Sequence, residues 1–247
     1  MGPYQKNLAS VYDALLGNAF FPIARRNFEW LVKRYSLYFQ SAADVACGTG
    51  HFVQYLCTWG IPVIGVDYSP AMLAVARKRG RNGCATFLQQ DMRKLKLPYK
   101  VDIMTCNFDS LNHLLTYADL FRTFQQFSKN LHSNGSVIFD LITNAWKRPG
   151  GLQNVLHVKA PEARSTWNIY WHPHKKIRTV LISHNVKAKD GRIVRLQECH
   201  REKGYAIPAV RRLLRKSGFD ALCILDVKTL HPAGKNTVRA LFLAQKT

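Results

Sequence analysis

The chain has 247 residues, 47% of them hydrophobic and 21% charged, which is typical of a folded globular protein and excludes a disordered or fibrous one. Its 36 Lys and Arg outnumber its 15 Asp and Glu, and the formal net charge of +21 attracts polyanions and acidic surfaces. Because the basic residues are spread along the whole chain, a generally basic surface with weak, non-specific nucleic-acid binding is favoured slightly over a dedicated nucleic-acid face.

Targeting and redox signals are sparse. No window approaches the roughly 20 apolar residues of a membrane-spanning helix, and the first residues lack the apolar run of a signal peptide. The 6 cysteines are scattered without a C-x-x-C pair, so neither a zinc site nor a disulfide framework is predicted. These features favour a reduced, cytoplasmic protein without a membrane partner or a bound metal.

The first predicted elements alternate between helix and strand. A helical pattern covers residues 8–38, and Pro22 is expected to divide it or to start its second half. A short apolar strand then runs into Gly48 and Gly50, and a helix follows to about Trp59. The next predicted elements are strand 62–67, helix 71–79, strands 86–91 and 101–107, helix 117–131 and strand 135–141. Such alternation predicts an α/β fold with a doubly wound, mainly parallel sheet.

The pattern changes after this point. Residues 146–205 show no helical period but contain three β-like runs and a hairpin signal at 189–191, which predicts an inserted antiparallel β ribbon. The three runs are 165–171, 177–186 and 192–199. A helix over 206–217 ending at Gly218, and strands over 222–230 and 238–244, complete the chain.

The most informative stretch is Asp44–Gly50, which reads D-V-A-C-G-T-G. Glycines there let the backbone turn sharply and leave room for a ligand. A dinucleotide fingerprint would require a third glycine where this chain has Val53, so an NAD oxidoreductase is a distant alternative. The form D-x-x-x-G-x-G resembles motif I of the class I S-adenosylmethionine (SAM)-dependent methyltransferases.

Further strings extend this resemblance over roughly the whole chain. Within the superfamily it is similar to the small-molecule N-methyltransferases, of the glycine N-methyltransferase and amino-sugar N,N-dimethyltransferase type. The strings lie at 11–13, 72–79, 90–92 and 110–114. The resemblance implies a Rossmann-like, seven-stranded sheet with SAM as cofactor. Its four parts would be an N-terminal helical lid (1–40), a SAM-binding core (41–145), an inserted substrate region (146–205) and a completion of the core (206–247).

The resemblance also assigns cofactor contacts. Gly48 and Gly50 would let the methionine part of SAM lie on the backbone, and Asp44 would balance its ammonium group through water. Asp67, at the end of the second strand, would accept hydrogen bonds from both ribose hydroxyls. The remaining expected contacts are Asp91 and Met92 at the adenine, Asn107 at the methionine arm, and Cys47 and Tyr68 beside the motif residues.

On the methyl-acceptor side, the resemblance nominates Tyr12 to orient the acceptor nitrogen and His113 to take its proton, with His200 as a similar candidate. Asp109 and Asn112 would either bind polar groups of the acceptor or hold their loop as turn residues. An aromatic set would either wall an acceptor pocket or, as favoured here, pack the ribbon on the core. This set comprises Trp146, Trp167, Tyr170 and Trp171.

The leading hypothesis is a SAM-dependent methyltransferase acting on a small-molecule acceptor, at an amine nitrogen. The net charge of +21 keeps two alternatives open: an rRNA or tRNA methyltransferase, and a non-catalytic protein of this fold in an RNA assembly. The first lacks an N-P-P-[YF] base-flipping string, because Asn107 is followed by F-D-S.

Overall fold

The computed structural model describes residues 9, 12–13, 18–80, 83–145, 153–160, 163–187 and 191–247, so Trp146 lies outside the described residues. Its main sheet has 7 strands in the order β10-β11-β5-β4-β1-β2-β3. The parallel strands are β1 (Ala42–Val45), β2 (Val63–Asp67), β3 (Ala85–Gln89), β4 (Val101–Cys106) and β5 (Leu131–Ile142). The antiparallel strands are β10 (Phe219–Asp226) and β11 (Arg239–Lys246). The predicted seven-stranded, mainly parallel sheet is confirmed.

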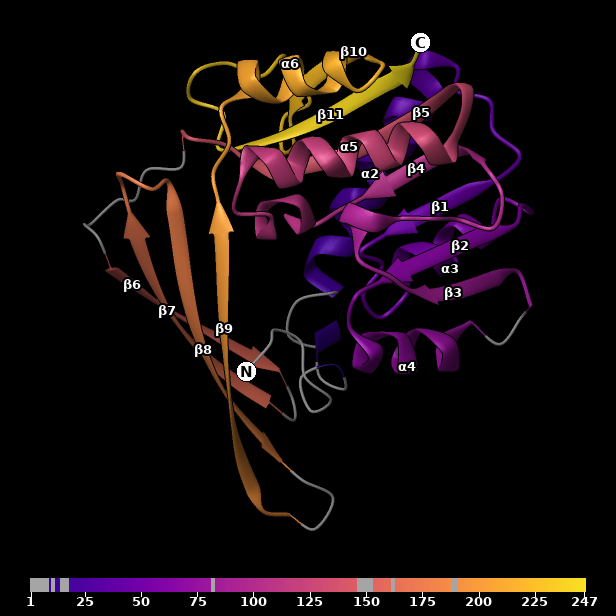
Figure 1. The fold of residues 1–247 in the computed structure, drawn as a ribbon. Helices are drawn as coiled ribbons and strands as arrows, with labels where there is room; N and C mark the ends of the chain where they lie inside the picture. The colour runs from indigo at the N-terminus through magenta and orange to yellow at the C-terminus, as the bar shows by residue number, and fades with distance from the viewer. Residues whose placement is uncertain are drawn as a thin grey trace.

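Helices cover both faces of this sheet (Figure 1). On one face lie α5 (Tyr117–Asn130) and α6 (Ile207–Lys216). On the other lie α2 (Asn18–Tyr35) and α3 (His51–Cys57), and Leu73 of α4 (Pro70–Arg79) joins the same apolar cluster. Pro22 lies inside α2, so the expectation that it divides the pattern or starts a helix is wrong. A proline lacks an N–H group, so at this position it removes one backbone hydrogen bond of the helix.

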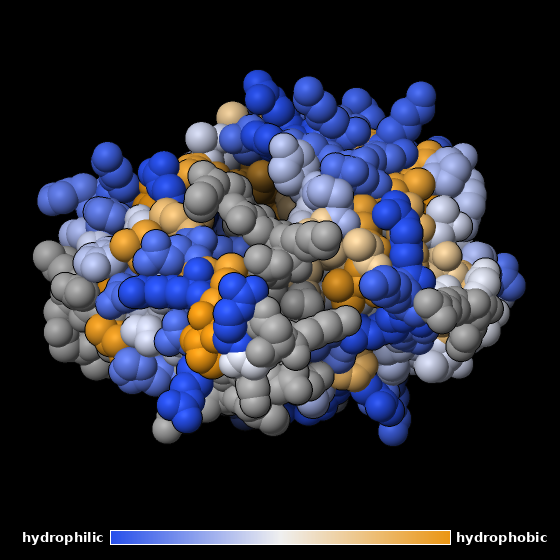
Figure 2. All heavy atoms as spheres, turned by 90° about the horizontal axis from the view of Figure 1, so that it is seen from below, coloured by the Kyte–Doolittle hydropathy of each residue, from blue (hydrophilic) through white to orange (hydrophobic). Residues whose placement is uncertain are grey.

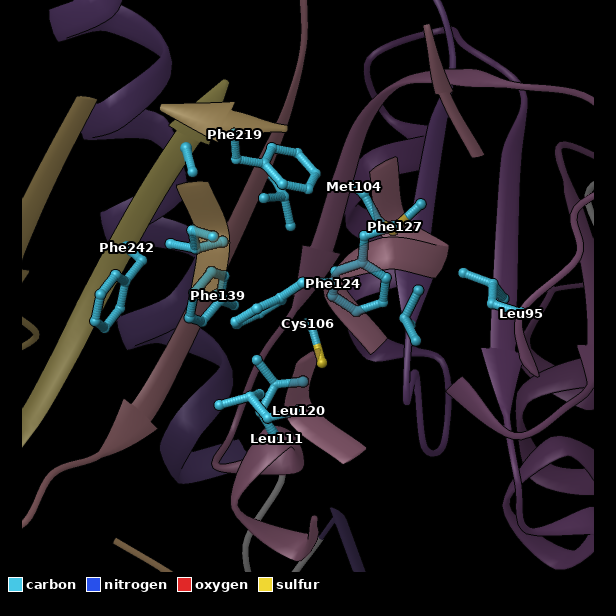
Figure 3. Packing of buried hydrophobic residues seen from close by; sticks show 14 of the residues in the cluster. Leu95, Met104, Cys106, Leu111, Leu120, Phe124, Phe127, Phe139, Phe219 and Phe242 are labelled. Atoms are coloured by element: carbon cyan, nitrogen blue, oxygen red, sulfur yellow. The ribbon is translucent and has the colours of Figure 1, made fainter. Parts of the chain in front are cut away.

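The core beneath α5 shows why this segment is helical. Leu120, Phe124 and Phe127 are spaced so that they share one face of the helix, and all three are buried. Phe124 packs on Phe139 with ring centroids 5.4 Å apart, and Phe139 stacks on Phe242 at 4.8 Å, as Figure 3 shows. These rings attach α5 to the middle strands, and thereby position the loops at the carboxyl ends of β4 and β5.

The inserted region forms a separate four-stranded antiparallel sheet in the order β6-β7-β8-β9. Its strands are β6 (Gln153–Ala160), β7 (Ala163–His172), β8 (Ile177–Lys187) and β9 (Ile193–Lys203). The predicted antiparallel ribbon is therefore present, but the prediction of three runs missed β6. The sheet stands beside the edge toward which the parallel strands point, so it faces the expected ligand site (Figure 1).

Tyr205, which is fully buried, anchors the inserted sheet to the core. Its hydroxyl donates to the carbonyl oxygens of Leu114 and, at 3.2 Å, Thr116, both just before α5. Two 3₁₀ turns complete the architecture, η2 (Met92–Lys94) and η3 (Ser110–His113). Because Tyr205 follows β9 directly, β9 is fixed close to η3.

The cysteine prediction is wrong for one pair, because Cys57 and Cys84 form a disulfide with Cα atoms 5.9 Å apart. Cys57 ends α3 and Cys84 precedes β3, and the pairing of β2 with β3 brings the two segments together. Cysteine spacing therefore gives no support for a reduced setting.

Among the described residues, no helix is both long and apolar enough to cross a bilayer. Hydrophilic residues cover most of the described surface seen from below (Figure 2).

Candidate active site

The glycine turn after β1 forms an open cradle. Gly48 has φ +55°, and a Cβ built on it would meet no atom of the described residues within 4 Å. Its N–H donates to Asp67 Oδ2 at 2.8 Å, while the N–H of Ser69 donates to Asp67 Oδ1 at 2.8 Å. Burial raises the pKa of Asp67 against these backbone hydrogen bonds. Each carboxylate oxygen keeps a further acceptor position, so Asp67 is held at the cradle ready to accept two hydroxyl groups.

Two polar residues lie beneath the cradle. Asp44, which is 3% exposed, accepts a 2.6 Å hydrogen bond from Thr105 Oγ1. Asn107 is also buried, and its Nδ2 has no hydrogen-bond partner among the described residues. Because an unsatisfied buried amide is costly, the donor of Asn107 is suited to a ligand acceptor such as a carboxylate or a hydroxyl.

The strand-end acid Asp91 is placed differently from Asp67. Arg93 forms hydrogen bonds to both of its carboxylate oxygens, at 2.6–3.0 Å, and these lower the pKa of Asp91. A contact from Asp91 to an adenine amine would use the lone pairs that remain. Met92 packs against the core, while Tyr68 is 74% exposed and Cys47 is buried.

These observations fit SAM as the bound group. The open Gly48 cradle, the buried Asn107 amide and the Asp67 carboxylate supply the space, the donor and the acceptors that its amino-acid and ribose parts require. Among the described residues, no group of three or more metal-ligating side chains is arranged to hold an ion. The roles of the individual residues stay predictions.

The burial of Asp44 predicts a pH dependence of cofactor binding. Burial raises its pKa to about 7, so the carboxyl group is largely protonated at pH 6 and ionised at pH 8. A cationic ammonium favours the ionised form, so binding releases a proton, and affinity rises toward tenfold per pH unit below the pKa. We expect this rise for S-adenosylhomocysteine between pH 5.5 and 7, where its own ammonium stays charged.

Calorimetry in two buffers of different ionisation enthalpy would detect the released proton directly. Asp44→Asn is expected to bind more weakly at pH 7 and to lose this pH dependence. If the affinity of the parent protein for S-adenosylhomocysteine does not change between pH 5.5 and 7, Asp44 does not contact the ammonium group.

The residue after Tyr12 ties the N-terminal segment to the cradle. Asp13 accepts a 2.5 Å hydrogen bond from Thr49 Oγ1 and a 2.5 Å hydrogen bond from Arg79 Nη2, and it lies 3.3 Å from His51 Nε2. Burial opposes ionisation, but hydrogen bonds from His51, Thr49 and Arg79 lower the pKa of Asp13 to about 2. The carboxylate is therefore ionised throughout the physiological range, and it ties the segment that carries Tyr12 to the motif residue Thr49.

Charged residues from three separate parts of the chain meet on the other side of the cleft. We call Asp109, Asp140, Arg178, Glu202 and Arg239 the ion-pair cluster. Asp109 lies 3.1 Å from Arg178 and 2.5 Å from Arg239, and Arg178 also pairs with Glu202. Asp140 pairs with Arg239 at 3.0 Å. The cluster joins β5, β8, β9 and β11 at the loop after β4, so it connects the inserted sheet to the core.

The loop after β4 owes its shape to Asp140. Phe108 and Asp109 have φ of 60° and 59°, a left-handed conformation that is costly for residues other than glycine. The N–H of Phe108 donates to Asp140 Oδ1 at 2.6 Å, which compensates for part of this cost. This turn presents Asp109 toward the inserted sheet.

The structure brings the two nominated histidines together. The rings of His113 and His200 lie 5.7 Å apart, and His200 Nε2 is 2.9 Å from Glu198 Oε2. Burial lowers the pKa of His113, opposed by Glu202 and reinforced by His200, so its imidazole is neutral near pH 7. A neutral imidazole can accept a proton.

Tyr12 lies within electrostatic reach of both sides of the cleft. Burial raises the pKa of its hydroxyl, and Asp109, Asp13 and Asp67 raise it further. The phenol is therefore protonated and can act as a hydrogen-bond donor. Asp67 belongs to the Gly48 cradle and Asp109 to the ion-pair cluster, so Tyr12 lies within electrostatic range of both groups.

Among the remaining candidates, Asn112 and Trp167 make contacts within the fold. Asn112 donates to the carbonyl oxygens of Ile142 and Lys203 and accepts from the N–H of Ile142, so it holds η3 against β5 and β9. Trp167 packs against the small apolar cluster of the inserted sheet. Tyr170 and Trp171 are partly buried strand residues of β7.

Several site residues were missed by the sequence analysis. Asp140 lies two residues before the end of β5, so a strand-end rule widened to the last three residues of a strand would have found it. Asp13 follows Tyr12 directly within a string that had already been noted. Arg178 and Arg239 carry no local signal, because only the direction of the antiparallel strands β8 and β11 brings them to this edge.

Comparison with known proteins places this geometry in context. Residues 42–135 match the family model described as a methyltransferase domain. A protein of Geobacillus sp. (strain WCH70) with a provisional methyltransferase name is 29% identical over 98% of this chain and 99% of its own. A dTDP-3-amino-3,6-dideoxy-alpha-D-glucopyranose N,N-dimethyltransferase of Streptomyces fradiae is 36% identical over 44% of this chain and 42% of its own.

Among solved structures, a SAM-dependent methyltransferase from Clostridium acetobutylicum superposes with a TM-score of 0.83. It is 24% identical to this chain, and the match covers 97% of this chain and 98% of that one. This likeness concerns the fold, including the inserted sheet. The expected class I methyltransferase fold is thereby confirmed, and the domain match over residues 42–135 agrees with it.

Proposed function

We infer that this protein, a methyltransferase with the class I fold of SAM-dependent enzymes, transfers a methyl group from SAM to the amine nitrogen of a small molecule. The observation that carries the choice of an amine is the placement of carboxylates. Of the 15 Asp and Glu residues in a chain of net charge +21, eight lie among the site residues described above, where four arginines pair with five of them. The eight are Asp13, Asp44, Asp67, Asp91, Asp109, Asp140, Glu198 and Glu202.

This distribution matches the charges of the reactants. SAM carries a sulfonium cation and an ammonium group, and an alkyl amine is a cation in neutral water. A site in which eight carboxylates outnumber four guanidinium groups, within a basic protein, attracts both and disfavours anionic acceptors. The amino-sugar N,N-dimethyltransferase that matches part of the chain acts, by its name, on a nitrogen, which agrees with this assignment.

Two requirements of the chemistry fall to the chain's own residues. An ammonium acceptor must lose a proton before its nitrogen can attack, and we assign the acceptance of that proton to His113, which is supported by its neutral imidazole next to His200. The acceptor must also be aligned with the methyl group, since SAM supplies only an activated methyl on sulfur. We assign to Tyr12 the hydrogen bond that fixes this alignment, which is supported by its protonated phenol within electrostatic reach of Asp109 and Asp67.

The test is a matched acceptor panel. Purified protein with isotope-labelled SAM would be offered amino sugars and simple amines, the corresponding hydroxyl compounds, and total RNA. We expect label on the amines, with mass spectrometry locating it on nitrogen. Labelling confined to hydroxyl compounds would overturn the amine assignment, and labelling confined to RNA would favour an RNA methyltransferase. Binding of SAM without transfer to any arm would favour a non-catalytic protein.

A further inference from the structure

The outer face of α5 and α6, on the side of the main sheet opposite to α2 and α3, carries a basic surface. We call these ten exposed residues the α5–α6 basic face: Arg93, Lys94, Lys96, Lys100, Arg122, Lys129, Arg211, Arg212, Arg215 and Lys216. They come from η2, the loop after it, α5 and α6, and α5 and α6 lie side by side on one face of the sheet (Figure 1).

Contacts between these elements make the face continuous. The loop after η2 is fixed to the end of α5, because the N–H of Leu97 donates to Asn130 Oδ1 at 2.7 Å. Near that end, Lys246 donates to the carbonyl oxygens of Ser128 and Leu131, and burial followed by the charge of Lys100 lowers its pKa. The end of α6 lies close by, since a Cβ on Gly218 would be 3.6 Å from Ser128 Oγ.

The positive charge of this face is largely uncompensated. Within the described part of the chain, Asp91 and Asp119 are the only acidic residues with a carboxylate oxygen within 4.0 Å of a side-chain nitrogen of these ten residues. They pair with Arg93 and Arg122. Basic residues in the last turn of a helix complement its dipole, which accounts for Lys129, Arg215 and Lys216. It does not account for Arg211 and Arg212 in the middle of α6 or for the charges on the loop after η2.

A groove between α6 and β10 gives the face a shape. It encloses about 590 Å³ and is lined by Arg211, Arg212 and Arg215 of α6, together with the apolar residues Ala221, Leu222 and Ile224 of β10. Arg211 and Arg215 are one helical turn apart, about 6 Å along the axis. The groove thus combines a row of cations with an apolar wall.

We propose that the α5–α6 basic face binds single-stranded RNA without sequence preference. Phosphates would lie along the α6 arginines, and unpaired bases would lie over the apolar wall and the guanidinium planes. Tyr99, 46% exposed between Lys96 and Lys100, offers a further ring on which a base can stack. A duplex fits less well, because its bases are already stacked in its interior.

An anionic membrane is a less suitable partner for the α5–α6 basic face than single-stranded RNA. An interfacial helix inserts its apolar side into lipid, whereas the apolar residues Val210 and Leu214 of α6 are buried in this protein. The exposed side of α6 therefore carries arginines but lacks large apolar side chains that could insert into a bilayer.

Two matched variants test the proposal. One replaces Arg211, Arg212, Arg215 and Lys216 by Gln, which keeps helix propensity. The other replaces Arg164, Lys175, Arg195 and Arg201 by Gln, exposed residues of the inserted sheet, so that both variants lose the same charge. Binding of a fluorescent 20-nucleotide single-stranded RNA of mixed sequence would be measured by anisotropy from 50 to 200 mM salt.

We expect the α6 variant to lose about tenfold or more in affinity and to flatten the slope of log K against log[salt] by about 3, since each phosphate contact on a single strand contributes about 0.7. The inserted-sheet variant should stay within about twofold of the parent. Equal losses in both variants would overturn the proposal in favour of general charge attraction. Absence of binding by the parent at 100 mM salt, or tighter binding to duplex DNA or to phosphatidylglycerol vesicles, would also overturn it. Binding of S-adenosylhomocysteine reports that both variants are folded.

Discussion

Replacing Gly48 by valine is expected to abolish SAM binding while leaving the protein folded. A Cβ at Gly48 would meet no described atom of the chain within 4 Å, so the new side chain would project into the open cradle. Its bulk would occupy the place of the cofactor, and a displacement on this scale costs about 10²-fold or more. Calorimetric titration with S-adenosylhomocysteine measures the loss.

The control for this prediction is Gly60→Val. Gly60 has φ +73°, close to the +55° of Gly48, and a Cβ there also meets no described atom within 4 Å. Both variants therefore carry the same left-handed strain, about 1–2 kcal/mol, and should unfold at similar denaturant concentrations. Only Gly48→Val should lose the ligand. If the two variants bind equally well, the cradle does not hold the cofactor.

Gly50 is not an equivalent test. A Cβ on Gly50 would lie 3.0 Å from the Cβ of Ala76 in α4, so valine there would separate α3 from α4. The two glycines of the motif therefore have different roles. Gly48 leaves room for a ligand, and Gly50 allows two helices to pack closely.

Much of the core fold was predictable because its signals are local. Buried parallel strands appear as short apolar runs, and helix starts have side-chain caps. At α4, for example, Ser69 Oγ accepts from the N–H of Met72, and Pro70 occupies the first helical position. The carboxyl ends of such strands meet at one edge, so a strand-end acid such as Asp67 could be placed from the sequence alone.

What the sequence did not predict depends on contacts between distant segments. The disulfide of Cys57 and Cys84 follows from the pairing of β2 with β3, which cysteine spacing does not report. The ion-pair cluster depends on the direction and register of β8 and β11, which bring Arg178 and Arg239 to Asp109. No periodic pattern in the sequence marks the side chains that antiparallel strands bring next to a parallel sheet. The residues on the methyl-acceptor side were therefore harder to predict than those on the cofactor side.

His113→Ala is expected to lower turnover by about 10²–10⁴-fold while leaving the affinity for S-adenosylhomocysteine nearly unchanged. The reason is its position, since His113 lies by His200 and the ion-pair cluster and not among the residues of the Gly48 cradle. His172→Ala, an exposed histidine at the end of β7, is the matched control and should turn over like the parent.

The pH profile separates a proton acceptor from a positioning residue. Burial lowers the pKa of His113 below its ordinary 6.5, so the imidazole is neutral and competent at pH 7. If it accepts the proton, the parent rate falls as the pH drops through this lowered pKa, and His113→Ala loses that limb of the profile. A residue that only positions the acceptor would lower the rate by the same factor at every pH. Parent-like turnover in His113→Ala would transfer the role to His200, whose contact with Glu198 keeps a second imidazole at the same edge of the cleft.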